Sequence, residues 1–339
     1  MGASSRLRVS QYIPELPDNI DAHISYLFDD DLVSLKLNKY EKVLKVIYLY
    51  FIRFLTLFTI FRYDLIFIQS EIFPKLPATI ERLLRVLKVK YVVDYDDAIF
   101  HNYDTKRNRS RVHRFFFSKK IDVVMKNSHR VVCGNDYLAS RAKSSGANDV
   151  VVIPTVVDHT RYSIKQHEIK EQIIIGWMGS PSTQKYLRNV HPVLQKLSNE
   201  FNIKLVVVGA TPSFDLEGVS LEVLPWEEAK ESYHINLFDV GIMPLDDGLW
   251  EKGKCGYKLI QYMACGIPVV SSAVGVNPEI IDYSRSGFVC NDNNEWLTAL
   301  RSLCLKKHLR VELGQNGRSA VINKYSLEAQ KESFLLALS

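Results

Sequence analysis

The sequence contains few cysteines, and none of them stands in a recognisable pair. Its 339 residues include five, at positions 133, 255, 265, 290 and 304, without any C-x-x-C spacing. Zinc sites normally show such spacing, and disulfide frameworks normally have an even number of cysteines. The pattern argues against both and predicts free thiols in a reducing compartment.

The chain also lacks a recognisable secretion signal, because residues 1–10 carry arginines with no apolar run behind them. Residues 46–61 are strongly apolar, but they number 16, against the roughly 20 that span a bilayer, and Arg53 stands at their middle. We expect a cytoplasmic protein in which this segment is a buried or interfacial helix.

Basic residues are concentrated in the first half. Residues 1–150 contain 24 Lys and Arg against 17 Asp and Glu, a net charge of +7, whereas residues 151–339 have a net charge of −2 (19 against 21). Cations cluster at residues 36–45 and 106–120. These stretches either lie on an anionic membrane surface or form solvated helix faces beside core aromatics. Neither belongs to a nucleic-acid-binding motif, so no nucleic-acid partner is expected.

What is present is an alternation of short runs rich in Val and Ile with longer helical patterns. Runs of this kind are typical of buried parallel strands, and they cover residues 63–69, 90–97, 129–135, 149–155, 172–180, 203–210, 239–245 and 266–272. The clearest helix is residues 77–88, with Ile80, Leu83, Leu84 and Leu87 on one apolar face. The alternation predicts an α/β protein with doubly wound sheets.

The two sets of strands predict two Rossmann-like domains that face each other across a cleft. Residues 154–172 are polar and strand-free and form the predicted linker. We place an N-terminal domain at residues 1–155, a C-terminal domain at residues 156–325, and a helix at residues 326–339 that crosses back to the first domain. No G-x-G-x-x-G follows an early strand, which argues against hydride transfer.

Ligands of doubly wound sheets bind beyond the carboxyl ends of the strands. The loop after residues 172–180 begins with Gly179, which permits a tight turn, and Ser180 or Ser182 can cap the next helix. The N–H groups at that helix start favour an anion such as phosphate. Serine and threonine at such positions often act only as caps, which is the alternative.

Two lysines stand at the entry to a second helix. Lys254 and Lys258 are four residues apart, so one helical turn would place both ammonium groups on the same side. Cations at a helix N-terminus oppose the helix dipole, and a bound diphosphate would remove the conflict. The alternative is a pair of solvated lysines.

Three carboxylates, Asp94, Asp96 and Asp97, end the strand at residues 90–97. Clustered acids raise one another's pKa and could orient or deprotonate an acceptor hydroxyl. They could instead cap the next helix, or hold magnesium together with Asp246 and Asp247. We do not favour the magnesium site.

The segment GYKLIQYMACGIPVVSSAVGVNPEII, residues 256–281, resembles the donor-binding signature of the large retaining glycosyltransferase family 4 of the GT-B fold, E-G-F-G-x-x-x-x-E-A-M-A-x-G-x-P-V-V. Residues 130–142, 151–162, 175–187, 239–245 and 284–291 resemble further parts of that family. The lysine-bearing form K-C-G-x-K is similar to a subgroup found in bacterial surface-polysaccharide clusters.

This sequence departs from the signature at both of its carboxylates. Gln261 stands in place of the second glutamate, where it could bond a ribose, and the first glutamate falls on Gly253. The family neutralises its leaving diphosphate with basic side chains and helix N-termini, so the resemblance implies no metal and no cofactor besides the nucleoside-diphosphate sugar. Trp177 and Trp226 are candidates for stacking on the base.

The expected site residues fall into three groups. The catalytic group is Asp96, Asp97 and Lys258; the donor-binding group is Gly179, Ser182, Thr183, Lys185, Lys254, Lys258 and Gln261; the acceptor-side group is Arg6, Glu71 and Asn135; and no metal ligand is assigned.

The sequence therefore predicts a retaining glycosyltransferase that moves a sugar from a nucleotide sugar to a glycan or lipid-linked acceptor. We expect it to work at the inner face of the membrane, in capsule, O-antigen or exopolysaccharide synthesis. The alternative is a catalytically silent nucleotide-sugar-binding or partner subunit, because the carboxylates are absent and residues 1–9 resemble a loop whose preceding strand is missing. A 2-epimerase of the same architecture would need a histidine, and the signature contains none.

Overall fold

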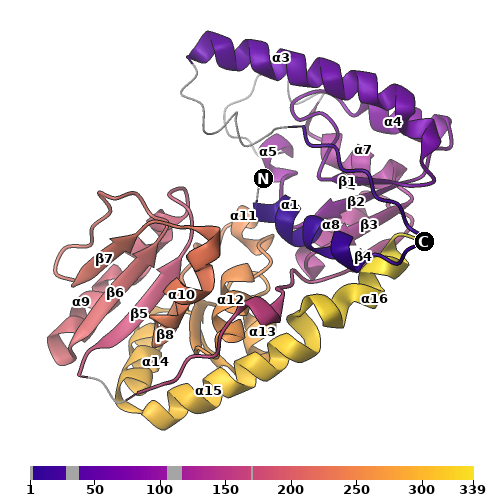
Figure 1. Ribbon diagram of the computed structural model, residues 1–339. Helices are drawn as coiled ribbons and strands as arrows, with labels where there is room; N and C mark the ends of the chain where they lie inside the picture. The colour runs from indigo at the N-terminus through magenta and orange to yellow at the C-terminus, as the bar shows by residue number, and fades with distance from the viewer. Residues whose placement is uncertain (1–2, 28–37, 105–116, 169–170) are drawn as a thin grey trace. The chain divides into compact units, whose positions relative to one another are not determined.

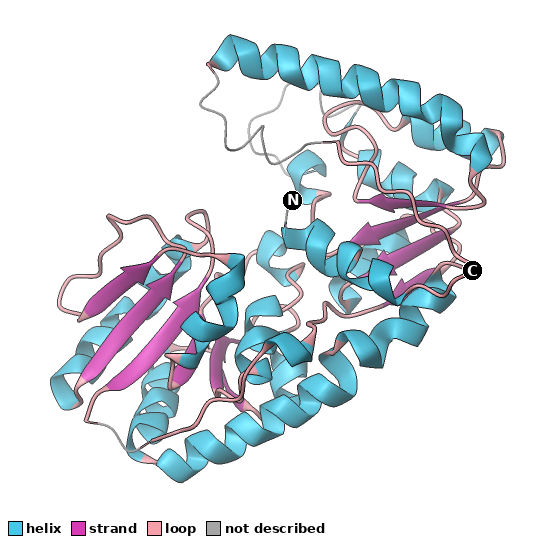
Figure 2. Ribbon diagram, viewed as in Figure 1, coloured by secondary structure: helices cyan, strands magenta, loops and turns pink. Residues whose placement is uncertain are grey.

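The computed structural model describes residues 3–27, 38–104, 117–168 and 171–339. It divides into two compact units (Figure 1), the first formed by Met1–Pro154 with Lys331–Ser339 and the second by Thr155–Gln330. Each unit contains one parallel sheet packed against helices (Figure 2), which confirms the predicted α/β class.

The sheet of the first unit has the order β1-β2-β3-β4, and all of its strands are parallel. The strands are β1 (Ile66–Gln69), β2 (Tyr91–Tyr95), β3 (Arg130–Cys133) and β4 (Val150–Val152), and the helices packed around them include α4 (Thr79–Val86), α5 (His101–Asp104), α7 (Lys120–Asn127) and α8 (Asp136–Ser144). All four predicted strands are present, each trimmed at its polar ends. The apolar face expected for α4 is only partly correct, because Leu84 is buried while Leu83 and Leu87 are exposed.

The start of the chain is helical. Helix α1 (Ala3–Arg8) is followed by the 3-10 helix η1 (Ser10–Glu15). The expectation of a loop at residues 1–9 is therefore wrong for the described residues of that segment. Arg8 and Leu7 of α1 are buried, so this helix is part of the first unit's core rather than an open loop.

A long helix follows, α3 (Lys39–Thr56), continued by the 3-10 helix η2 (Leu57–Arg62). Asn38 and Glu41 form a reciprocal capping box that fixes its start. Of the two alternatives predicted for this segment, a buried or an interfacial helix, the buried one is wrong, because most of its large apolar side chains are exposed. Among the described residues, Tyr40–Arg62 is the helical stretch with the length and apolar composition of a membrane-crossing segment.

The last helix, α16 (Leu327–Ala337), ends in the first unit. The ring of Phe334 stacks on Tyr12 with centroids 4.0 Å apart. Ala337 is buried in a cluster with Val92 and Val132 of the sheet. The C-terminal residues therefore complete the core of the first unit.

The sheet of the second unit has the order β10-β9-β8-β5-β6-β7, again all parallel. Its strands are β5 (Ile173–Met178), β6 (Ile203–Val208), β7 (Leu221–Leu224), β8 (Val240–Met243), β9 (Val269–Ser272) and β10 (Gly287–Cys290). The four predicted strands are confirmed. The prediction missed the edge strands β7 and β10, which are four residues long and half-buried except for Cys290. The strand order reverses at β5, between β6 and β8.

Helices complete the second unit around this sheet. They are η4 (Gln184–Val190), α9 (His191–Glu200), α10 (Glu231–Asn236), α11 (Leu249–Lys252), α12 (Tyr257–Ala264), α13 (Asn277–Ser284), α14 (Asn293–Leu305), α15 (Lys307–Ala320) and the π-helical turn η6 (Val321–Tyr325). Two buried apolar clusters pack against the sheet, one formed largely with α12 and the other largely with α9 and α14.

Residues 154–172 are not a free linker, and that prediction is wrong for most of the segment. Val157 forms a β-bridge with Ser326, and the Lys165 ammonium lies 3.3 Å from the buried carboxylate of Asp239. Tyr162 is also buried. These apolar and ionic contacts make the segment part of the second unit.

Two glycines let α12 approach the sheet closely. Gly176 of β5 and Gly241 of β8 are register neighbours. A Cβ on Gly176 would lie 1.9 Å from the ring of Phe238, and one on Gly241 would lie 2.4 Å from the ring of Tyr262. The two rings pack edge to face at 5.8 Å. The glycines therefore set the position of Tyr262, and with it the position of α12.

Replacing Tyr262 by phenylalanine is expected to lower the free energy of unfolding by about 1–3 kcal/mol. The Met178 N–H donates to Tyr262 Oη at 2.8 Å, and both residues are buried. The variant leaves this donor without its acceptor. Urea unfolding measures the change, and Tyr233→Phe, at an exposed tyrosine, is the control. Equal effects of the two variants would contradict the prediction.

Candidate functional site

The candidate site begins at the carboxyl end of β5, where the strand order reverses. A Cβ on Gly179 would lie 2.4 Å from the ring of Trp177 and 2.9 Å from Thr183 Oγ1. Gly209, after β6, has φ +84°, and a Cβ there would lie 2.2 Å from the Gly179 carbonyl oxygen. The loops after β5 and β6 therefore meet beside the switch point, which lies between β5 and β8 and is the usual ligand position in such sheets.

The loop between Gly179 and η4 is polar and mostly exposed. The hydroxyls of Ser180 and Ser182 lie 2.8 Å apart, and Thr183 Oγ1 accepts from the Ser180 N–H and donates to its carbonyl oxygen. Thr183 is the N-cap of η4 and makes no side-chain cap bond. The expected cap by Ser180 or Ser182 is therefore wrong, because these hydroxyls bond each other within the turn.

Lys258 lies close to this loop. It stands on the first turn of α12, with Nζ 5.7 Å from the centroid of the Trp177 ring. That ring also packs against Gly179. Gly179 thus lies against both the Trp177 ring and Thr183, and Lys258 lies beside the same ring. Trp177 itself is 1% exposed, so its proposed role of stacking on a base is wrong.

Lys254 is not on the same helical face as Lys258, and that prediction is wrong. Helix α12 starts after Gly256, which has φ +66° and whose added Cβ would lie 2.2 Å from Ile280 Cδ1. Lys254 precedes this turn, in a loop where its N–H donates to the Glu251 carbonyl at 3.1 Å. Both lysines are half-buried, which distinguishes them from a fully solvated pair.

Lys185 is exposed, and its Nζ lies 4.8 Å from the ring centroid of Tyr186. The Tyr186 hydroxyl donates to Glu251, which is 8% exposed. The sequence prediction missed Glu251 because the family spacing places its glutamate at Gly253, two residues further on. A buried carboxylate is therefore present beside this loop although the aligned position lacks one.

A second polar network continues from α12. Gln261 is buried, and its amide Nε2 donates to Tyr162 Oη at 3.3 Å. Burial, together with Tyr257 and Glu231, raises the pKa of Tyr162 well above its ordinary value, so this hydroxyl stays protonated and donates to Glu231. Gln261 thus has an internal partner, and its expected bond to a ribose stays a prediction.

Trp226, which follows strand β7, belongs to the same network. Its indole N–H donates to Glu231 Oε2 at 3.3 Å, and 45% of the side chain is exposed. The Cβ of Trp226 is also a close neighbour of Gly209. Sequence reasoning missed Glu231 and Tyr162, which stand outside the signature. Trp226 remains the candidate for stacking on a base.

In the first unit, the aspartates after β2 are divided by burial. Asp94 is buried and forms an ion pair with buried Arg8, Nη2 to Oδ1 2.6 Å. Burial raises the pKa of Asp94, Arg8 opposes that shift, and Asp96 adds to it. Asp96 thus raises the pKa of Asp94, as predicted for clustered acids, but burial raises it more. Asp96 and Asp97 are half-buried at the loop after the strand.

The predicted acceptor-side residues are placed as follows. Glu71 is paired with the buried ammonium of Lys120 and accepts from the Tyr103 hydroxyl at 2.8 Å. Asn135 caps α8 by accepting from the Leu138 N–H at 3.0 Å. Arg6 is half-buried on α1. Glu71 and Asn135 therefore have structural partners, and an acceptor role for either would be additional.

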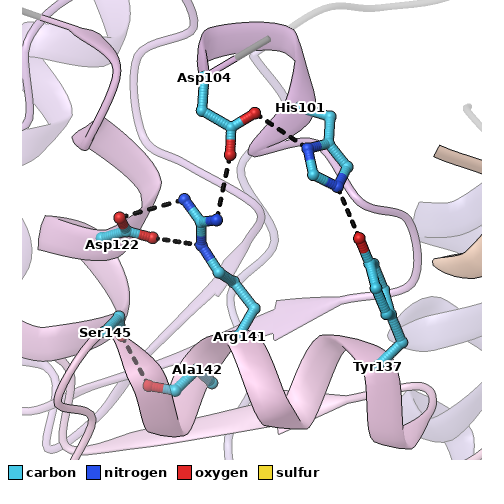
Figure 3. A network of polar contacts seen from close by, with 7 residues as sticks. All are labelled: His101, Asp104, Asp122, Tyr137, Arg141, Ala142 and Ser145. Atoms are coloured by element: carbon cyan, nitrogen blue, oxygen red, sulfur yellow. Dashed lines mark hydrogen bonds and ion pairs between the residues drawn. The ribbon is translucent and has the colours of Figure 1, made fainter. Parts of the chain in front are cut away.

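A network near Asp97 connects three helices (Figure 3). His101 of α5 contacts Asp104 at 2.9 Å and the Tyr137 hydroxyl at 2.8 Å. Arg141 of α8 bridges Asp104 and Asp122, at 3.1 Å and 2.7 Å. Local patterns gave no sign of these pairings, which span up to 37 residues along the chain. They hold α5, and the loop before it, against α7 and α8.

The cysteines and the possible metal ligands of the described residues bear on thiol and metal chemistry. All five cysteines are free, as predicted. Burial raises the pKa of Cys133, Cys265 and Cys290 to about 12, which leaves these thiols protonated. Within the ranges that the structure describes, no group of three or more His, Cys, Asp or Glu residues could hold a metal ion.

The two parallel-sheet units define the class: this is the GT-B fold of glycosyltransferases, and the predicted fold is confirmed. Anabaena HepE in complex with UDP-glucose is similar with a TM-score of 0.64 and 14% identity, over 84% of this chain and 82% of that chain. WaaG, a glycosyltransferase involved in lipopolysaccharide biosynthesis, is similar with a TM-score of 0.58 and 14% identity, over 77% and 81% of the two chains.

Sequence comparison agrees with the fold. Residues 172–306 match the family described as glycosyl transferases group 1. The chain is 26% identical over 151 residues to N-acetyl-alpha-D-glucosaminyl L-malate synthase of Bacillus anthracis, a match that covers 42% of this chain and 39% of that relative's length. The family match lies within the second unit and includes both Gly179 and Lys258. Together with the fold it supports the predicted enzyme class, a glycosyltransferase.

Proposed function

We propose that the protein transfers a sugar from a nucleoside-diphosphate sugar to a glycan or lipid-linked acceptor, with retention of the anomeric configuration. The observation that carries the proposal is that Gly179 lies against the Trp177 ring and Thr183, with Lys258 beside the same ring, next to the switch point of the second sheet. This arrangement combines a cation, a glycine turn with serine and threonine hydroxyls, and a helix start, which are elements that bind a diphosphate.

In this proposal each donor-side residue acts on one part of the donor. Lys258 stabilises the negative charge that develops on the leaving diphosphate. The turn of Gly179, Ser182 and Thr183 binds the phosphates through N–H and hydroxyl groups, and Lys185 and Lys254 add positive charge. The exposed indole of Trp226, held by Glu231, stacks on the base. The expected reaction needs no metal and no further cofactor.

The acceptor side of the proposal rests on the first unit. Asp96 and Asp97 lie half-buried beyond the carboxyl end of β2, where a carboxylate can orient or deprotonate an acceptor hydroxyl. Arg6 is the cation proposed for the same side. The similarity to WaaG and the K-C-G-x-K subgroup resemblance support a role in bacterial surface-polysaccharide synthesis at the inner face of the membrane.

The experiment is calorimetric titration of the purified protein with a panel of nucleoside diphosphates and their sugars, without added metal. The expected result is micromolar binding of one diphosphate and of its sugar, followed by donor turnover when acceptor glycans are supplied. A protein that binds none of the panel, with or without magnesium, contradicts the proposed function.

A catalytically silent, nucleotide-sugar-binding subunit is the second candidate. The observation that favours it is Gln261, which replaces a signature glutamate and is buried against Tyr162. This candidate predicts donor binding without hydrolysis or transfer on any acceptor of the panel. Turnover in the same experiment excludes it.

A further inference from the structure

Helix α3 lies on the outside of the first unit (Figure 1). Together α3 and η2 expose a long row of apolar side chains. Its main side chains, Ile47, Tyr48, Phe51, Phe54, Phe58 and Phe61, are each 46–69% exposed. We call these six residues the α3 apolar face. Soluble monomers rarely expose a contiguous apolar surface of this kind unless it binds a partner or a membrane.

The opposite side of α3 is attached to the first unit. The Tyr50 hydroxyl donates to the Pro74 carbonyl at 2.6 Å, and its ring packs against Phe73 with centroids 5.4 Å apart. Arg53 donates to the Ser25 carbonyl at 2.9 Å. A bilayer-spanning orientation would break these contacts and place Arg53 in the hydrocarbon, which is costly. The attached side therefore fixes the helix along the unit, with the α3 apolar face outward.

The charges of this segment identify the kind of surface it fits. Residues 39–62 contain five Lys and Arg and one acidic residue, Glu41. Two of the cations, Lys42 and Lys45, stand on the first turns of α3. Cations beside an apolar, aromatic-rich helix face are complementary to anionic headgroups over acyl chains. A soluble protein partner would need no such excess of positive charge.

We propose that the α3 apolar face docks the first unit onto an anionic bilayer, with α3 parallel to the membrane plane and not across it. Phe51 and Phe58 enter the boundary between headgroups and acyl chains, while Lys42 and Lys45 contact lipid phosphates. The surface belongs to the first unit and the donor-side residues to the second, so the inference does not depend on the proposed transfer reaction. If both hold, the docked unit meets its acceptor at the lipid surface.

The test is co-sedimentation of the full chain with vesicles of phosphatidylcholine, alone or mixed with phosphatidylglycerol. The wild type is expected to bind the mixed vesicles, and Phe51→Glu/Phe58→Glu is expected to bind them at least about tenfold more weakly. The matched control, Leu305→Glu/Leu336→Glu, adds the same charge at residues 68% and 62% exposed on other helices and is expected to bind as the wild type does. Lys42→Gln/Lys45→Gln is expected to weaken binding to the mixed vesicles only.

Three results would overturn the inference. Equal vesicle binding by the wild type and the double-Glu variant would remove the α3 apolar face from the interaction. Retention in the vesicle pellet after alkaline extraction would show a spanning helix instead of a docked one. A wild type that ignores vesicles but forms a concentration-dependent dimer, lost in the double-Glu variant, would assign the face to a second copy of the chain.

Discussion

Lys258→Ala is expected to lower kcat/KM of the proposed transfer by about 10²- to 10³-fold. The ammonium stands on the first turn of α12, beside the ring that packs against Gly179. No second cation occupies that position on α12, whose sequence is YKLIQYMA. Diphosphate affinity is expected to fall by about tenfold, or 1.4 kcal/mol. Steady-state kinetics and calorimetry on the same preparations measure the two effects.

Two further variants test whether the lost positive charge causes the fall in kcat/KM. Lys258→Arg keeps the charge and is expected to recover part of the rate. Lys252→Ala removes a nearby half-buried lysine, which pairs with Asp247 at 3.1 Å, and is expected to retain wild-type kinetics. If Lys258→Ala and Lys252→Ala change kcat/KM and diphosphate affinity equally, Lys258 does not bind the diphosphate, which must then bind elsewhere.

Arg8→Ala is expected to lower the free energy of unfolding by about 3–5 kcal/mol, because it leaves the carboxylate of Asp94 buried without its partner. Arg8 bonds both oxygens of Asp94 and also donates to the Ile153 carbonyl at 2.7 Å. Arg82→Ala, at an exposed arginine of α4, is the control and is expected to change stability by less than about 0.5 kcal/mol. Urea unfolding at neutral pH measures both.

The loss caused by Arg8→Ala should depend on pH with a definite sign. Burial raises the native pKa of Asp94 and Arg8 opposes the rise, so removing Arg8 raises the pKa further. A native state that holds a proton which the unfolded chain releases loses stability as pH increases. The cost of the variant is therefore largest near neutral pH and shrinks toward the acid range. A pH-independent cost would show that lost packing, and not the buried charge, causes the effect.

Replacing the pair together separates charge from packing. Arg8→Met/Asp94→Leu removes both charges at similar volume and is expected to be far more stable than Arg8→Ala alone. A double variant as unstable as the single one would mean that the bond from Arg8 to the Ile153 carbonyl carries most of the stability.

Much of the fold could be predicted because buried parallel strands have a dense, local signature. The run from Ile203 to Val208 is apolar at nearly every position, and so are the other central strands. The edge strand β7 contains Glu222 and only half-buried residues, so no comparable run marks it. Helix α3 could be predicted only as buried or interfacial, because an apolar sequence records hydrophobicity but not whether protein or another apolar phase covers it.

The site residues likewise fall into those that local motifs predict and those that depend on contacts between distant parts of the chain. Gly179 and Lys258 belong to short motifs, and local spacing was enough to select them. The start of α12 depends on the left-handed turn at Gly256, which moved Lys254 off the helix. Arg8 and Asp94 are 86 residues apart, and Tyr162 and Glu231 are 69 apart. Pairings over such distances leave no periodic pattern, so a single sequence does not reveal them.

The division of α16 between the two units has a consequence for how the chain acquires its structure on the ribosome. Phe334 and Ala337 fill the core of the first unit but follow the second unit along the chain. The second unit is continuous, from Thr155 to Gln330, and can complete its core first. The first unit therefore reaches its final packing only after the whole of the second unit has been synthesised.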